Sequence, residues 1–158
     1  MDEHNPDEPI NLQETVEQAG MDKPLCVEAD LSIRQVLAML QENRVGSVLV
    51  CKDEKLTGIF TERDVVKLLA SGADLDARID TVMSRNPQTT EPTDTIAVAI
   101  QRMSRGGYRR LPVIDAEGRP VGVVKVTLIV HYLVQHFPEA VYNLPPDPNS
   151  VTKEREGA

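Results

Sequence analysis

Two stretches of this 158-residue chain match each other in the order and spacing of their anchor residues. Ile33 is echoed by Ile96 at an offset of 63 residues, and Gly58 is echoed by Gly122 at an offset of 64. A duplication constrains the fold strongly, because both copies must adopt one structure and neither can bury its small sheet alone. We therefore predict an α+β fold in which two βαββα-type repeats pack sheet to sheet as one pseudo-twofold module.

Each copy carries the same elements in the same order. A short extended piece (25–27 and 88–90) precedes an amphipathic helix with apolar residues at helical spacing. These residues are Ile33, Val36, Leu37 and Leu40 in the first copy, and Ile96, Ala99, Ile100 and Met103 in the second. Ser32 is the expected N-cap of the first helix, and Thr93 or Thr95 that of the second. Two strands (47–51 and 56–60; 111–114 and 120–124) and a closing helix (62–70; 127–135) complete each copy.

The duplication divides the chain into four segments. Residues 1–20 form a polar leader with a short amphipathic helix over 10–20 that ends at Gly20. Residues 21–72 and 83–136 form the two repeats. Residues 137–158 form an extended tail, because the proline-rich stretch at 143–149 cannot continue a helix.

Composition limits the classes of protein to which the chain can belong. With 41% hydrophobic and only 3% aromatic residues, the core must be aliphatic. A formal charge of −8 and scattered basic residues disfavour nucleic-acid binding. No apolar run reaches the ~18–20 residues of a membrane span, and the acidic start is no signal peptide, so we expect a cytoplasmic protein. Cys26 and Cys51 lie in apolar runs, which predicts two buried, reduced thiols.

Nothing in the sequence indicates catalysis. His131 and His136 are five residues apart, about 140° around a helix, and His4 lies in the leader, so the histidines form no metal site. The chain has no Gly-x-Ser-x-Gly turn, no phosphate-binding loop ending in Gly-Lys-Ser/Thr, and no Gly-x-Gly-x-x-Gly run. We therefore expect a protein that is not an enzyme and needs no metal or cofactor.

The runs GIFTERD at 58–64, YRRLPVID at 108–115 and GVV at 122–124 resemble the cystathionine β-synthase (CBS) domain family. The resemblance covers about residues 21–136 and implies a tandem CBS pair of the stand-alone bacterial type. It also implies a regulatory, signal-transducing module that binds AMP, ADP or ATP, and less readily NAD or S-adenosylmethionine, in a cleft between the copies. A homodimer formed through helices, and a second, unidentified protein that the module regulates, are further implications of the resemblance.

Thr61 and Asp64 are the central candidates for binding. They stand where a strand passes into a helix, and a helix N-terminus favours phosphate through its free N–H groups and its dipole. The resemblance implies that Asp64 binds the ribose hydroxyls, that Thr61 contacts ribose or phosphate, and that Gly58 permits close approach. Thr61-x-x-Asp64 is equally a capping-box pattern that needs no ligand, and the two roles can coexist.

Further candidates surround this pair. Arg63 is either a phosphate contact or a solvated helix residue. Of Arg109 and Arg110, at most one should face the cleft, because neighbouring strand residues point to opposite faces. The adenine would lie against apolar strand residues, of which Ile59 is our candidate. Backbone groups near Thr89 and Thr90 would read the base edge, although both threonines are also ordinary turn and strand residues.

The second copy departs from the first at the binding positions. Lys125 replaces Thr61 and Leu128 replaces Asp64, while the first copy has Gly46 and Ser47 in place of the arginine pair. We therefore predict one competent cleft, centred on Thr61 and Asp64. The alternative is a dimeric interaction scaffold whose degenerate sites bind no nucleotide.

Overall fold

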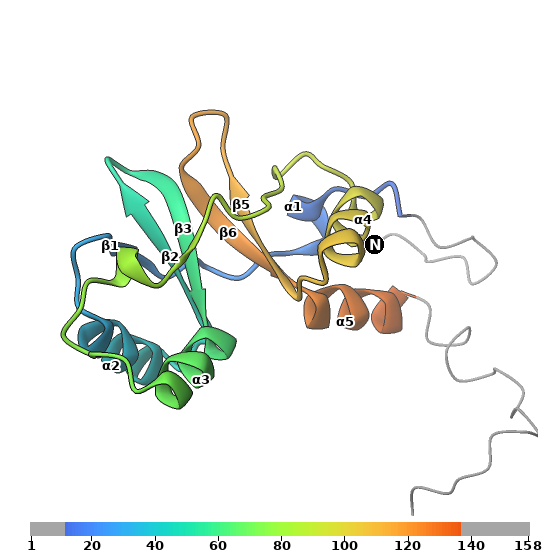
Figure 1. Cartoon of the computed structure of the whole chain (residues 1–158). Coiled ribbons are helices and arrows are strands. Elements are labelled where there is room, and N and C mark those ends of the chain that lie inside the picture. Colours follow the sequence, from blue (N-terminus) through green and yellow to red (C-terminus); the bar gives the residue numbers. More distant parts are fainter. Residues whose placement is uncertain (1–11, 137–158) are drawn as a thin grey trace, which may run out of the picture.

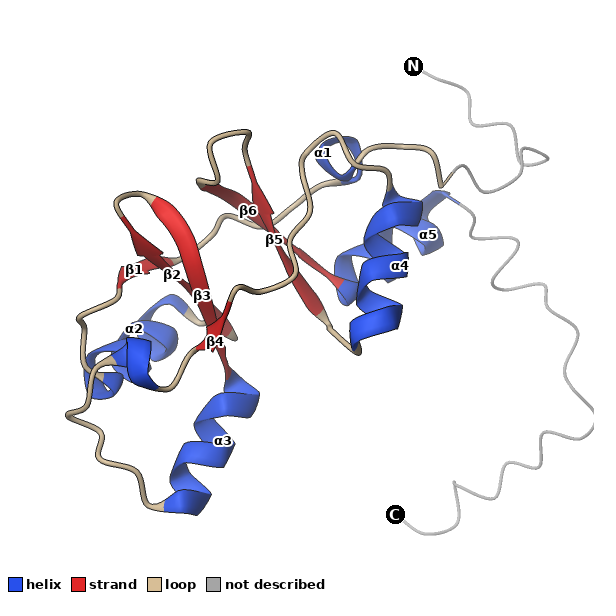
Figure 2. Cartoon of the chain, turned by 45° about the horizontal axis from the view of Figure 1, so that its top comes forward, coloured by secondary structure: helices blue, strands red, loops and turns tan. Residues whose placement is uncertain are grey.

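The computed structural model describes residues 12–136, in which two small sheets lie between two pairs of helices (Figures 1 and 2). The predicted loose leader at 1–9 and the predicted extended tail at 137–158 lie outside the described residues. No helix within residues 12–136 is long and apolar enough to cross a bilayer.

The elements follow the predicted order in both copies. They are α1 (Val16–Ala19), β1 (Cys26–Glu28), α2 (Ile33–Asn43), β2 (Ser47–Lys52), β3 (Lys55–Thr61), α3 (Glu62–Ser71), a 3-10 turn η1 (Ile79–Thr81), β4 (Ser84–Arg85), α4 (Ile96–Gly106), β5 (Arg110–Ile114), β6 (Pro120–Lys125) and α5 (Val126–His136). The chain therefore has the predicted α+β fold of two repeats.

The two sheets differ in size. The first has the strand order β1-β2-β3-β4, with β1 parallel to β2 and the other neighbours antiparallel. The second contains only the hairpin β5-β6. The extended piece predicted at 88–90 is reduced to one parallel bridge between Thr90 and Val113. It is short because Pro92, which has no N–H, follows two residues later.

The predicted amphipathic helices bury the predicted faces. In α2, Ile33 and Val36 have no exposed surface, and in α4 the same holds for Ala99. Ser32 caps α2 through a capping box, in which its hydroxyl accepts from the Gln35 N–H at 3.1 Å and its own N–H donates to Oε1 of Gln35 at 2.9 Å. Of the two candidates for the second N-cap, the structure uses Thr95.

The segment before the first repeat packs against the second repeat. The carbonyl oxygens of Leu12 and Glu14 accept hydrogen bonds from the N–H groups of Ala97 at 3.0 Å and Ile96 at 2.8 Å, which open helix α4. Val16, only 2% exposed, completes the core of the second repeat. Because residues 12–14 form a turn and bend and Thr15 forms a bridge with Thr95, the described part of the predicted helix 10–20 is reduced to α1 at Val16–Ala19.

The connector between the repeats packs against the first repeat in the same way. The carbonyl oxygens of Leu75 and Ala77 accept from the N–H groups of Arg34 and Ile33, both at 2.9 Å, at the start of α2. Ile79 is fully buried in the first core. The opening segment of each repeat (12–21 for the first, 75–83 for the second) therefore supplies backbone acceptors and several apolar side chains to the opposite copy.

A methionine of each opening segment packs against a glycine in the sheet of the opposite repeat. Met83 lies over Gly58 in the first sheet, and Met21 lies over Gly122 in the second. A Cβ at Gly58 would lie 2.3 Å from the sulfur of Met83, and one at Gly122 would lie 2.4 Å from that of Met21. A Cβ at either glycine would therefore force the methionine of the opposite opening segment to move.

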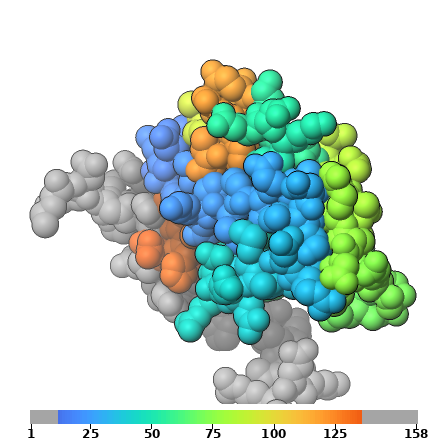
Figure 3. All heavy atoms as spheres, turned by 90° about the vertical axis from the view of Figure 1, so that its left-hand side faces the viewer, coloured from blue at the N-terminus to red at the C-terminus, as the bar shows by residue number. Residues whose placement is uncertain are grey.

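The inner faces of the two sheets meet in a small apolar cluster. Leu49, Ile59 and Val123 are buried there, and Leu56 packs beside them. The Leu56 N–H donates to the carbonyl oxygen of Gly118 at 3.0 Å, so the two hairpin turns lie side by side (Figure 3). The predicted sheet-to-sheet packing is therefore present.

The two cysteines differ from the sequence-based expectation. Cys51 is buried, and burial raises the pKa of its thiol to about 12. Cys26 is exposed, although both thiols were expected to be buried. On edge strand β1 it is Val27 that points into the core, so its neighbour Cys26 faces the other way.

The start of the second repeat is held by a partly buried polar network. Oδ2 of Asp94 accepts from Arg102 at 2.7 Å, from the Glu91 N–H at 2.8 Å and from the Thr90 hydroxyl at 2.9 Å. Burial of this carboxyl would raise its pKa, but these hydrogen bonds outweigh burial and hold the pKa below its ordinary value.

We expect Met83→Ala to lower the free energy of unfolding by about 2–4 kcal/mol, because it empties a buried site that seals the exchange. Urea denaturation followed by circular dichroism measures this change. Gln41→Ala, at an exposed side chain of similar length on α2, is the matched control and should change stability by less than about 0.5 kcal/mol. Equal effects of the two substitutions would contradict a sealing role for Met83.

We expect Asp94→Asn to lower the free energy of unfolding by about 1–2 kcal/mol at pH 7. The folded pKa lies below the unfolded one, so the carboxylate stabilises the fold above about pH 4 and loses this effect as pH falls through the folded pKa. Denaturation at pH 7, 5 and 3.5 should show wild type and variant converging in acid. A difference that does not change with pH would rule out an ionised carboxylate as the cause.

Candidate functional site

A cleft of about 380 Å³ lies between the two repeats. Its lining residues include those at the junction of β3 and α3 and those at the start of β5. Figure 2 shows that both places lie at the ends of the hairpins opposite their turns. It is lined by Ile59, Thr61, Glu62, Arg63, Asp64 and Lys67 of the first repeat, by 84–88 of the connector, and by Gly107, Tyr108, Arg109, Arg110 and Pro112 of the second. Clefts that hold small molecules have volumes of about 300–1,000 Å³, so this one is large enough for a ligand.

Most of the site residues predicted from the sequence meet in this cleft. Ile59, Thr61, Arg63, Asp64, Arg109 and Arg110 all line it. Gly58, Thr89 and Thr90 are not among its lining residues. Met83 covers Gly58, and the Thr89 carbonyl accepts a hydrogen bond from Arg102 at 3.0 Å. Thr90 is 1% exposed and bound to Asp94.

Thr61 and Asp64 form a cap at the first turn of α3. Oδ2 of Asp64 accepts from the Thr61 N–H at 2.9 Å and from the Thr61 hydroxyl at 3.2 Å. Its other oxygen, Oδ1, accepts no hydrogen bond from the residues that the structure describes. The cap thus uses one carboxylate oxygen and leaves the second free to accept from a ligand.

Arg110 reaches from the second repeat to the start of α3 in the first. Its guanidinium lies over Gly46, where a Cβ would stand 2.3 Å from Nη2 of Arg110 and 3.1 Å from the carboxyl carbon of Glu62. Within residues 12–136, the buried Nε of Arg110 has no hydrogen-bond partner. A buried donor without an acceptor is costly, and such groups in native proteins call for a partner.

Both arginines of the pair border the cleft, which corrects the expectation that at most one would. Strand β5 begins at Arg110, so Arg109 precedes the strand and the alternation of strand residues does not apply to it. The first copy has Gly46 at the position that corresponds to Arg109. Because Gly46 has no side chain, it makes room for the guanidinium of Arg110 from the second copy. The Thr61 and Asp64 pair of the first copy and the arginine pair of the second copy therefore line one cleft.

Sequence reasoning missed several residues of the cleft wall. Lys67 stands one turn beyond Arg63 on α3, a spacing that could have indicated it. Arg85 and Asn86 lie where the second copy has one more residue than the first between its methionine and proline. Asn86 adopts a left-handed conformation, with φ of 48°, which no sequence pattern indicated. Tyr108, 48% exposed, also borders the cleft.

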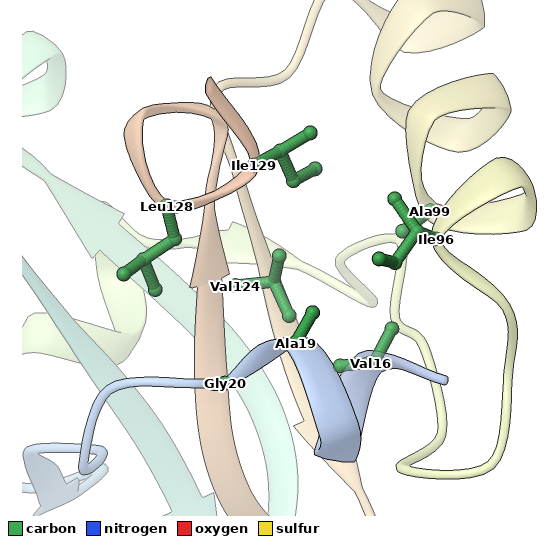
Figure 4. A pocket seen from close by; sticks show the side chains of 8 residues that line it. All are labelled: Val16, Ala19, Gly20, Ile96, Ala99, Val124, Leu128 and Ile129. Atoms are coloured by element: carbon green, nitrogen blue, oxygen red, sulfur yellow. The ribbon is translucent and has the colours of Figure 1, made fainter. Parts of the chain in front are cut away.

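The corresponding positions of the second copy are arranged differently. Nζ of Lys125 forms an ion pair with Oδ2 of Asp22 at 2.8 Å. Leu128 lines an apolar void of about 10 Å³ against α1, together with Val16 and Val124 (Figure 4). A void of this size is at the lower limit for a single water molecule, ~10–15 Å³, so it cannot hold a nucleotide.

Comparison with known sequences identifies the repeats. The family model described as CBS domain matches residues 16–71 and 79–135, segments that begin at the exchanged residues Val16 and Ile79. An uncharacterized 17.7 kDa protein of Acidianus ambivalens is 29% identical over 112 residues, which cover 70% of this chain and 68% of that protein. The uncharacterized protein MJ1225 of Methanocaldococcus jannaschii is 28% identical over 123 residues, covering 77% of this chain but only 44% of that relative.

Solved structures share the fold. The CBS domain protein PAE2072 from Pyrobaculum aerophilum, complexed with AMP, superposes with a TM-score of 0.71 at 24% identity, covering 78% of this chain and 98% of that one. The CBS domain pair of protein MJ0100, in complex with 5-methylthioadenosine and S-adenosyl-L-methionine, also gives 0.71 at 24% identity, covering 77% and 97%. The chain therefore belongs to the CBS domain family, and its two repeats form a CBS pair.

Proposed function

We propose that this CBS pair is a regulatory module that binds an adenosine nucleotide in the cleft between its repeats. The observation that carries the proposal is the meeting of Thr61 and Asp64 from one repeat with Arg109 and Arg110 from the other. The buried, unpartnered Nε of Arg110 supports it, because an anionic ligand would supply the missing acceptor.

Each part of a nucleotide has a chemical counterpart in the cleft. The free Oδ1 of Asp64 can accept a hydrogen bond from a ribose hydroxyl while Oδ2 keeps its cap on Thr61. The N-terminus of α3 and the guanidinium of Arg110 favour a phosphate. Ile59 and Pro112 offer apolar surface to a base.

The solved relatives support the same ligand class. PAE2072 is complexed with AMP, and the MJ0100 pair with 5-methylthioadenosine and S-adenosyl-L-methionine. At 24% identity these proteins share the fold with this chain, so the argument for a ligand rests on the cleft residues themselves.

A ligand in this cleft would act as a switch. It would contact both repeats, so its affinity would depend on how the repeats are packed against each other. Differential affinity for two packings is what allows a ligand to shift a conformational equilibrium. The signal would then pass to a second protein that the module regulates, which requires no catalytic step in the cleft.

We further propose that the module works as a homodimer formed through its closing helices. Val66 and Leu69 of α3 are 67% and 64% exposed, and Val126 and Val130 of α5 are 38% and 54% exposed. Exposed aliphatic side chains at helical spacing on both closing helices are typical of helix–helix interfaces.

We expect Asp64→Ala to weaken AMP or ATP binding at least tenfold in isothermal titration calorimetry, because the variant removes the ribose acceptor. The substitution also removes a cap, so Gln35→Ala, which deletes the equivalent acceptor for the Ser32 N–H in α2, is the matched control and should bind normally.

Gly46→Ala tests the contribution of Arg110. The new Cβ displaces the end of the Arg110 side chain and should also weaken binding tenfold, with little loss of stability.

Unchanged affinity in Asp64→Ala would exclude the ribose role. A thermal-shift panel of AMP, ATP, NAD and S-adenosylmethionine tests the whole proposal, because a ligand at about 100 times its dissociation constant adds ~2.7 kcal/mol of stability. No shift with any ligand would favour the alternative, a dimeric scaffold whose sites are degenerate.

We expect the full chain to elute as a dimer of 17.5 kDa protomers in size-exclusion chromatography with light scattering. Leu69→Glu and Val130→Glu should each produce monomers, because a buried unpaired carboxylate opposes association. Val121→Glu, at an exposed position on β6, is the control and should leave the dimer intact. A wild-type monomer would contradict the proposal.

A further inference from the structure

The charge of the cleft is opposite to that of the protein as a whole. The chain carries a formal charge of −8, yet five cationic side chains line the cleft beside only two carboxylates. The cations are Arg63, Lys67, Arg85, Arg109 and Arg110, and the carboxylates are Glu62 and Asp64. The wall of the cleft therefore has a formal excess of three positive charges.

None of these cations forms an ion pair within residues 12–136, although the carboxyl group of Glu62 lies beside the Arg110 guanidinium at Gly46. The ion pairs within residues 12–136 involve Arg34, Arg78, Arg102, Arg119 and Lys125, and none of them involves a cation of the cleft. Arg85 donates to the carbonyl oxygen of Asp80, which leaves its charge uncompensated. Unpaired cations drawn from both repeats and from the connector are held close together, an arrangement that a polyanion would stabilise.

The cations are also spread too widely for one phosphate. If Asp64 holds the ribose, the first phosphate lies at the N-terminus of α3, beside Arg110. Lys67 stands one turn beyond Arg63, about 5–6 Å farther along the helix. A single phosphate contributes a charge of about −1.5 to −2, whereas a chain of two or three phosphates can follow the wall and compensate the remaining cations.

We infer that the cleft selects a nucleoside di- or triphosphate over a monophosphate, and that Lys67 is a specificity-determining residue for the terminal phosphates. The inference rests on the proposed function and narrows its ligand. The same positive excess opposes a cationic adenosine compound such as a sulfonium, because the ligand would add charge of the same sign.

Calorimetry on the full chain at constant ionic strength, with adenosine, AMP, ADP and ATP as probes, tests this inference. Affinity should rise with each phosphate and be at least tenfold higher for ATP than for AMP. Lys67→Gln should weaken ATP binding at least fivefold and change AMP binding less than twofold. Arg105→Gln, which removes a basic residue of α4 outside the cleft, is the matched control and should bind both nucleotides normally.

The possible failures can be told apart. Equal affinity for AMP and ATP, or an equal loss of both in Lys67→Gln, would overturn the selection of polyphosphates and leave nucleotide binding intact. In the thermal-shift panel, a larger stabilisation by S-adenosylmethionine than by ATP would overturn it in the same way. No binding of any of the four probes would overturn the proposed function together with this inference.

Discussion

The structure depends on an exchange of opening segments between its two repeats. Backbone groups at the start of each helix α2 and α4 are satisfied by carbonyls from the segment that precedes the other copy. Val16 and Ile79 then fill the cores so formed, at 2% and 0% exposure. Because neither copy can complete its core with its own opening segment, the two repeats stabilise each other and hold the cleft between them.

The exchange also explains how a symmetric scaffold can hold one asymmetric site. Repeats that are packed against each other share each cleft, so a residue lost from one copy can be supplied by the other. Arg110 crosses to the α3 end because Gly46, the residue that corresponds to Arg109 in the first copy, has no side chain. At the opposite position Lys125 pairs with Asp22, and Leu128 borders a small apolar void against α1. The two copies thus differ at the positions that would line the clefts.

Much of the fold could be predicted from the sequence, because periodicity reports directly on buried faces. The apolar stripe beginning at Ile33, the hairpins and the capping residue Ser32 follow from local patterns. The exchange could not be predicted, since no local pattern states which copy an opening segment joins. The sequence placed Thr61 and the arginine pair at one cleft, but it did not predict that Arg109 and Arg110 both line it. Lys67 and Asn86 were missed because their place depends on a helix face and on a left-handed turn.

We propose that this duplicated chain forms one working cleft from residues of both copies. Calorimetry with ATP, on protein of known active concentration, measures the number of nucleotides bound per chain. We expect one nucleotide per chain. Two per chain would contradict it, because the second nucleotide would have to occupy the cleft in which Lys125 is paired with Asp22.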